Sequence, residues 1–321
     1  MPGSSGPRKE DLTTRRQFLG AVATLAGIVG STGASRAFAV IKGSANTSAL
    51  LLTHPWRARS GEIEPSIKSV ATLLLETVGA WSTSEGTIRD ARKRLTAAGF
   101  NPAFADALGL LSGNGTNAVL QVRDAQYGGI LNTSASVLVV VDQWRRMSDG
   151  SIQVGGTTVD VRLVKATPHW RIVEVLPARS GNATAQLSSS AKRVLAESRI
   201  RLPFAAKSDV LAGGIHDSVL KMLINLSTLH LVDVSVMRSG HPLNVFGTSR
   251  ASDHPLGRAV DVWALDAKPL VVPSNHALAS SAMRLAVTHG AYNVGGPNLL
   301  SGQQYFSDRT HRDHIHIGFN Y

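Results

Sequence analysis

The chain has 321 residues, enough for about two domains beyond an N-terminal signal. It carries 33 Lys and Arg against 22 Asp and Glu, a formal net charge of +11 that suits an anionic polymer as partner. No cysteine is present, which excludes disulfides and thiolate metal ligands. The sequence has no basic run with interleaved aromatics and no helix-turn-helix or zinc-finger pattern, so we expect no nucleic-acid partner.

The N-terminus has the pattern of an export signal. Arg15 and Arg16 form a twin-arginine pair ahead of a mildly apolar run at 18–30, and Ala37 and Ala39 make a small-x-small cleavage site. A transmembrane anchor is the alternative, but the run of about 13 to 17 residues is shorter than the ~20 that span a bilayer. We therefore expect a twin-arginine signal peptide over 1–39, recognised by the twin-arginine translocase. The mature protein would lie in the periplasm, in the cell wall or outside the cell, with no stable membrane anchor.

Residues 40–178 predict a helical segment and a small α+β accessory domain. Apolar residues recur at helical spacing from Ile67 to Val78, and a similar pattern follows at 88–95. Turns are predicted at 149–150 and at 155–156. Three Val- and Ile-rich runs predict antiparallel strands: 136–144, 157–164 and 170–175. Helices followed by such a sheet are typical of nuclear-transport-factor-2-like or cystatin-like folds. With no catalytic constellation, the domain would pack against the next one, bind glycan or hold a partner.

A polar stretch of small residues at 179–190 predicts a linker, and residues 191–321 then form a second α+β domain. Its predicted helices are 191–198, 215–229 and 276–289. Its predicted strands are 232–236, 259–264 and a last strand that begins at Asp313.

Two histidine-bearing segments of this domain have the composition of a mononuclear zinc site. His254 lies in a polar turn, and Asp261 follows in an apolar strand, where a carboxylate is costly unless it is paired or bound to a cation. Strand alternation puts His314 and His316 on one face. His254, Asp261 and His316 could then bind one metal ion and leave a coordination position open. The alternative is that Asp261 pairs with a nearby arginine and the histidines are ordinary polar residues.

These residues also carry a resemblance to a known family. The spaced motif resembles the signature of the zinc D-Ala-D-Ala carboxypeptidases and related peptidoglycan peptidases (the LAS superfamily), whose fold is shared by the Hedgehog signalling domain. The matching pattern is Ser252-x-His254-x-x-Gly257-x-Ala259-x-Asp261, followed by His314-x-His316. The resemblance covers roughly residues 190–321 and implies an antiparallel sheet with helices. It also implies one zinc ion bound by His254, Asp261 and His316.

The resemblance implies further site residues. His314 would be the unliganded neighbour that stabilises a tetrahedral intermediate or moves a proton. Many relatives carry a Glu base three residues before the last ligand, and here that position is Asp313, which alternation turns away from His316. Asp313 and His314 are therefore both candidate bases. Arg238 is the best placed candidate to hold a substrate carboxylate, and Ser252 is expected at the substrate site.

The sequence thus predicts an exported zinc metallopeptidase that hydrolyses peptidoglycan stem peptides, with peptidoglycan and its D-amino-acid peptides as partners. D,D-carboxypeptidases, D,D-dipeptidases and endopeptidases share the same metal ligands, so the bond that is cut stays open. The alternative is a non-catalytic, zinc-stabilised protein that binds the cell wall or acts as a scaffold. Such a protein would need neither Asp313 nor His314, and this chain has both.

Overall fold

The computed structural model describes residues 38–40, 50–167 and 169–321, which form two β-sheets with helices around them. Over these residues the architecture is mixed α+β, as the sequence predicted, and it contains seven α-helices. The finer assignments, Hedgehog-like and nuclear-transport-factor-2-like or cystatin-like, stay predictions. Most of the predicted export signal lies outside the described residues, apart from Phe38 and Ala39 in a short strand.

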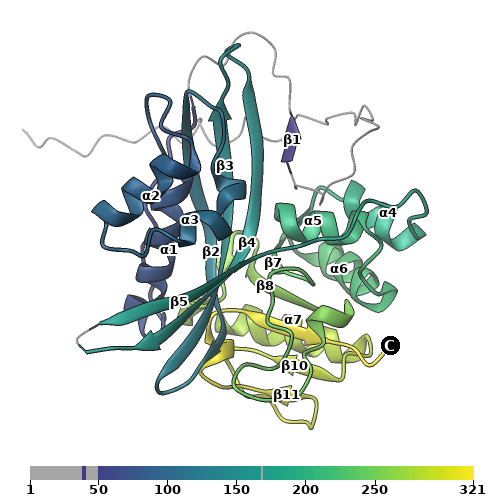
Figure 1. Ribbon diagram of the computed structural model, residues 1–321. Helices are drawn as coiled ribbons and strands as arrows, with labels where there is room; N and C mark the ends of the chain where they lie inside the picture. The colour runs from purple at the N-terminus through teal and green to yellow at the C-terminus, as the bar shows by residue number, and fades with distance from the viewer. Residues whose placement is uncertain (1–37, 41–49, 168) are drawn as a thin grey trace, which may run out of the picture. The chain divides into compact units, whose positions relative to one another are not determined.

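The N-terminal half, residues 38–40 and 50–177, places three helices beside an antiparallel sheet (Figure 1). The sheet has five strands in the order β1-β4-β3-β2, with β5 also paired to β4. Its helices are α1 (Pro65–Gly79), α2 (Ile88–Ala97) and α3 (Phe104–Ala107), followed by the 3-10 turn η2 (Gly109–Leu111). Its strands are β1 (Phe38–Val40), β2 (Asn117–Ile130), β3 (Ser134–Arg146), β4 (Ile152–Lys165) and β5 (Trp170–Pro177).

The C-terminal half, residues 189–321, contains a seven-stranded sheet in the order β11-β10-β12-β8-β7-β6, with β9 also paired to β8. Its helices are α4 (Ser189–Ala196), α5 (Phe204–Leu211), α6 (Asp217–Leu229) and α7 (His276–Thr288), with 3-10 turns η3 (His254–Leu256), η4 (Pro273–Asn275) and η5 (Thr310–Arg312). Its strands are β6 (Ile200–Arg201), β7 (Val232–Val236), β8 (Ala259–Leu265), β9 (Lys268–Pro269), β10 (Asn293–Gly295), β11 (Tyr305–Phe306) and β12 (Ile315–Gly318).

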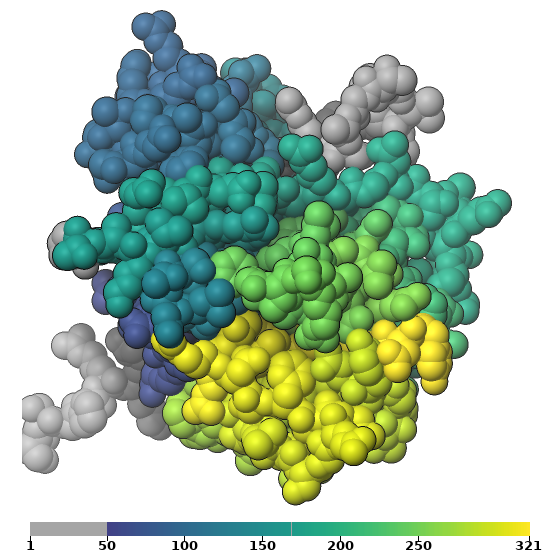
Figure 2. Space-filling model, turned by 60° about the horizontal axis from the view of Figure 1, so that its bottom comes forward, coloured from purple at the N-terminus to yellow at the C-terminus, as the bar shows by residue number. Residues whose placement is uncertain are grey.

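Strand β2 changes which face it turns to the core of its own half. Leu120 and Val122 belong to that core, but after a bulge at Arg123 the core residues are Ala125 and Tyr127. An extra residue in one strand reverses the alternation of all side chains that follow it. The next even-numbered side chains therefore point away from the N-terminal core. Figure 2 shows the teal residues of this region beside the yellow C-terminal residues, and Ile130 N–H donates to Thr310 Oγ1 at 3.3 Å.

Some predicted boundaries were wrong for identifiable reasons. Residues 155–156 lie inside β4 rather than in a turn. A Cβ on Gly156 would lie 2.7 Å from the Phe204 ring of α5, so this glycine permits close packing. The last strand begins at Ile315, because Asp313 has a helical backbone conformation (φ −108°, ψ −6°). Strand β2 and helix α5 were not predicted.

Candidate metal centre

Three buried side chains of the C-terminal half direct one donor atom each at a common point. His254 Nε2 and His316 Nδ1 are 3.1 Å apart, and Asp261 Oδ1 lies 3.2 Å from the first and 3.1 Å from the second. Ligands at 2.0 to 2.1 Å from a tetrahedral zinc ion lie about 3.3 Å from one another. The triangle therefore has nearly the dimensions that a bound zinc ion requires. We call these three residues the donor triangle.

The secondary structure explains why these residues meet. His316 of β12 and Asp261 of β8 are direct partners across two antiparallel strands. Side chains on directly opposed residues share a face of the sheet. His254 opens η3, which ends at Gly257 in the left-handed region (φ 70°) with its N–H bonded to the His254 carbonyl. A Cβ on Gly257 would lie 2.1 Å from the Gly214 carbonyl oxygen, so only glycine fits here.

The hydrogen bond of His254 to the backbone leaves its facing nitrogen available as a ligand. His254 Nδ1–H donates to the Met237 carbonyl, which leaves a lone pair on Nε2. His254, Asp261 and His316 are 0%, 1% and 7% exposed. Three electron-rich atoms buried so close together repel one another unless a proton or a cation lies between them. Two imidazoles and one carboxylate also match the ligand preferences of zinc.

A third histidine, His241, extends the group. The ring of His241 stacks on that of His254 with centroids 4.0 Å apart, and His241, His254 and Asp261 together form a group that could hold a metal ion. The Nδ1–H group of His241 donates to the Pro242 carbonyl, so Nε2 carries a lone pair that could bind a metal ion. Sequence reasoning missed His241, although the His-Pro pair at 241–242 repeats the one at 254–255. The centre thus has two overlapping donor sets, which differ in His241 and His316.

His314 stands next to the triangle without belonging to it. Its Nε2 lies 3.7 Å from Asp261 Oδ1, and its Nδ1–H donates to Asp313 Oδ1 at 2.6 Å. The second oxygen of Asp313 accepts from Lys68 Nζ at 2.6 Å and from Tyr127 N–H at 3.1 Å. Asp313 therefore lies behind His314 and contacts the N-terminal half, whereas His314 faces the triangle.

Burial and neighbouring charges set the protonation of the centre. Burial favours neutral Asp261, but His254 and His314 outweigh it and hold the pKa of Asp261 well below its usual range. Burial lowers the pKa of His316 to about 4, with only partial compensation by Asp261. For His314, burial is outweighed by Asp261 and Asp313, which raise its pKa to about 9. At neutral pH Asp261 is thus ionised and His316 neutral, the forms that bind metal.

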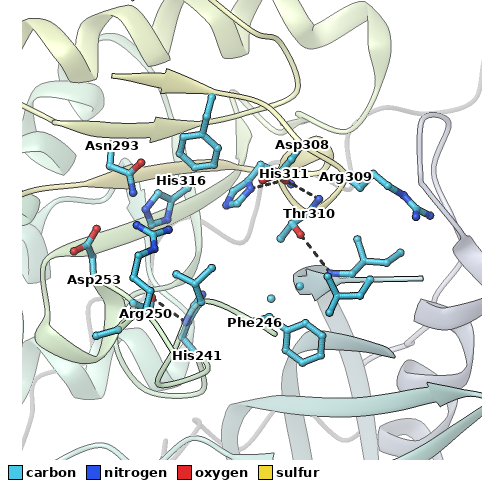
Figure 3. Close-up of a pocket in the computed structure, with 18 residues that line it drawn as sticks. His241, Phe246, Arg250, Asp253, Asn293, Asp308, Arg309, Thr310, His311 and His316 are labelled. Atoms are coloured by element: carbon cyan, nitrogen blue, oxygen red, sulfur yellow. Dashed lines mark hydrogen bonds and ion pairs between the residues drawn. The ribbon is translucent and has the colours of Figure 1, made fainter. Parts of the chain in front are cut away.

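A cleft of about 460 Å³ opens beside the triangle and is lined by residues of both halves. In Figure 3, His241, Arg250 and Asp253 lie on one wall, and Asp308, Thr310 and His311 lie on the facing one. Residues 128–131 of the N-terminal half and Phe246 close another side. His316 is the member of the triangle that reaches this cleft, so a ligand there would approach the metal position from that side.

The sequence-predicted substrate residues have different positions. Ser252 lines the cleft, and its Oγ accepts weakly from His254 N–H at 3.4 Å. Arg238 is not among the lining residues, and its Nε donates to the Pro255 carbonyl at 3.0 Å. Arg250 and Arg309 do line the cleft. Arg238 was preferred because it follows a predicted strand, a criterion that says nothing about which way the next loop turns.

No family model, curated protein or solved structure matches this chain. Within the described residues, no helix combines the length and the apolarity needed to cross a bilayer.

Proposed function

We propose that the chain is an exported zinc-dependent peptidase that hydrolyses peptidoglycan stem peptides, as a D,D-carboxypeptidase or a related D,D-peptidase. The observation that carries this proposal is the donor triangle, with sides of 3.1 to 3.2 Å, at the edge of a cleft of about 460 Å³. A volume of this size is typical of sites for small molecules and short peptides. Three protein ligands leave one coordination position open, as in catalytic rather than structural zinc sites.

The residues around the triangle have separable roles in hydrolysis. Zinc held there would supply Lewis-acid polarisation of the scissile carbonyl and a nucleophile at neutral pH. His314 donates through Nδ1, and because its pKa is raised to about 9 it also carries a proton on Nε2 at neutral pH, which it can donate to the tetrahedral intermediate or to the leaving amine. Both oxygens of Asp313 are engaged, by His314 and by Lys68. We therefore assign proton transfer to His314 and the orientation of its ring to Asp313.

For the substrate we replace Arg238 by Arg250 as the group that holds a carboxylate. Arg250 lines the cleft together with Ser252 and His316, whereas Arg238 does not line it and donates through Nε to the Pro255 carbonyl. An arginine can bind a carboxylate through two parallel hydrogen bonds, which fixes the orientation of a peptide end. The chain keeps an excess of basic residues without its signal segment, and this positive charge would further favour an anionic cell-wall polymer around the substrate.

Incubation of purified protein with muropeptides and zinc, followed by mass spectrometry, tests the proposal. Wild type should release D-alanine or a peptide fragment, and His316→Ala and His314→Ala should release far less. His289→Ala is the matched control, because His289 is exposed and its ring bonds to Asn225 rather than to a residue of the donor triangle. If wild type leaves every muropeptide intact, the peptidase proposal fails and the non-catalytic, zinc-stabilised wall-binding protein becomes the better interpretation.

A further inference from the structure

Gln126 of the N-terminal half contacts the donor triangle from behind. Its Nε2 donates to Asp261 Oδ2 at 2.6 Å, and its Oε1 accepts from Ser235 Oγ. The side chain is 1% exposed. Because an ionised carboxylate only accepts hydrogen bonds, the NH₂ group must face Asp261, and the amide oxygen then accepts from the serine hydroxyl. One oxygen of Asp261 is thus held by Gln126, and the other faces His254 and His316.

Lys68 makes an equivalent contact with the second carboxylate of the centre. It lies on the buried face of α1, is 0% exposed, and donates to Asp313 Oδ2 and to Glu62 Oε2. Asp313 in turn accepts from the ring of His314. Lys68 thus acts on His314 through one intervening carboxylate.

Packing the two halves together would not by itself favour a buried lysine or glutamine at these positions. An apolar residue fills the same volume without the desolvation of an ammonium group or an amide, and replacing buried ion pairs by apolar residues often stabilises a fold. The bulge at Arg123 is what turns Gln126 away from its own core and towards Asp261. Both polar side chains meet a carboxylate of the metal centre rather than an arbitrary surface.

We propose that α1 and β2 form the supporting layer of the metal centre, with Gln126 as a positioning residue for Asp261 and Lys68 as a positioning residue for His314. The first part concerns metal binding alone. The second part rests on the proposed function, because it concerns turnover. The N-terminal half then contributes residues to the metal centre and is not only an accessory domain.

The first part is tested by metal affinity, measured on metal-free protein by competition with a chromophoric chelator. Gln126→Leu should weaken zinc binding about 10- to 100-fold, the usual effect of losing a hydrogen bond that orients a ligand. Gln143→Leu is the matched control, since Gln143 is also buried and its amide donates to Gly79 and Leu111 of its own half rather than to a residue of the metal centre. Equal affinity of Gln126→Leu and wild type would overturn this part.

A milder variant covers the case in which Gln126→Leu does not fold. Ser235→Ala keeps the amide but removes the hydroxyl that fixes its orientation. Ser235→Ala should also weaken zinc binding, but by less than Gln126→Leu does. Unchanged affinity in a folded Ser235→Ala protein, with Gln126→Leu unfolded, would also count against the proposal.

The second part is tested by a split between turnover and metal binding. Lys68→Met should lower kcat on muropeptides by about tenfold or more, as expected for a misplaced reacting group, while zinc affinity changes little. Lys68→Gln keeps a neutral hydrogen-bond donor, so its kcat should lie between those of wild type and Lys68→Met. Glu62→Gln is the matched control, because it removes the other partner of Lys68 and leaves Asp313 bonded. An equal loss in Glu62→Gln and Lys68→Met would overturn the assignment to Lys68.

The outcomes separate this inference from the proposed function. Zinc affinity that responds to Gln126→Leu, in a protein that cleaves no muropeptide, would support the positioning role and contradict the peptidase. Cleavage by wild type, together with equal zinc affinity in all variants, would support the peptidase and contradict the positioning role of Gln126. A wild type that binds no zinc would overturn both.

Discussion

His316→Ala is the substitution that examines the donor triangle most directly. It removes the Nδ1 atom that lies 3.1 Å from both other donors and leaves His254 Nε2 and Asp261 Oδ1 as a pair. Structural zinc sites with four ligands are worth about 10 to 16 kcal/mol, which is about 3 kcal/mol for each ligand. A loss of about 3 kcal/mol corresponds to metal binding that is more than about 100-fold weaker.

Thermal unfolding with and without zinc converts this loss into a measurable shift. At a zinc concentration about 1,000 times the dissociation constant of wild type, binding stabilises the native state by about 4 kcal/mol. For a chain of this size, about 2 to 4 °C in Tm for each kcal/mol gives a shift of about 10 °C. At the same zinc concentration, a variant with 100-fold weaker binding gains only about 1.4 kcal/mol, or about 4 °C.

Two comparisons decide what the result means. His289→Ala should keep the full shift, because His289 is exposed and outside the centre. His241→Ala tests the alternative donor set, in which His241 joins His254 and Asp261. An equal zinc-induced shift in His316→Ala and wild type would refute the assignment of His316. A larger loss in His241→Ala than in His316→Ala would move the metal to the alternative set.

Three further outcomes are expected. His314→Ala and Asp313→Asn should keep stoichiometric zinc, and at least one should lose ~10²- to 10⁴-fold in turnover; wild-type rates in both would exclude them from proton transfer. Burial outweighs Lys68 and raises the pKa of Glu62 from 4.5 to about 7. Between these pH values only the folded state keeps this proton, so the free energy of unfolding should fall as pH rises. The fall should be up to about 3 kcal/mol larger in wild type than in Glu62→Gln. Denaturant titrations that give the same pH dependence of this free energy for both proteins would contradict the prediction. Replacing Arg15 and Arg16 together by lysine should abolish export, because the translocase reads the arginine pair itself, and normal appearance of mature protein outside the cytoplasmic membrane would show that the signal was misread.

The donor triangle could be predicted because each of its residues stands in a short-range sequence pattern. Strand alternation alone places a histidine of β12 on one face, and an acid within the apolar strand β8 already indicates a partner or a cation. The cross-strand pairing of His316 with Asp261 then needs only that the two strands be neighbours. The role of Asp313 was harder to predict, because alternation applies only to extended backbone and Asp313 is not extended.

The supporting residues could not be predicted from spacing. Gln126 lies 135 residues before Asp261, and Lys68 lies 245 residues before Asp313. The sequence did hold a signal for Lys68, since it sits beside Ile67 on the apolar face of a predicted helix and a buried ammonium needs a partner. For Gln126 no signal existed, because its direction depends on a bulge that hydrophobic patterning does not reveal.

The two carboxylates of the centre divide their oxygens in the same way. Asp261 gives Oδ1 to the histidines of the triangle and Oδ2 to Gln126. Asp313 gives Oδ1 to His314 and Oδ2 to Lys68. In each case the histidine that contacts the carboxylate belongs to the C-terminal half, and the hydrogen-bond donor that restrains the carboxylate belongs to the N-terminal half. Because a carboxylate held at one oxygen has lost most of its rotation, its other oxygen is oriented before any metal or substrate arrives. Movement between the halves would therefore be transmitted directly to the metal position and to the ring of His314.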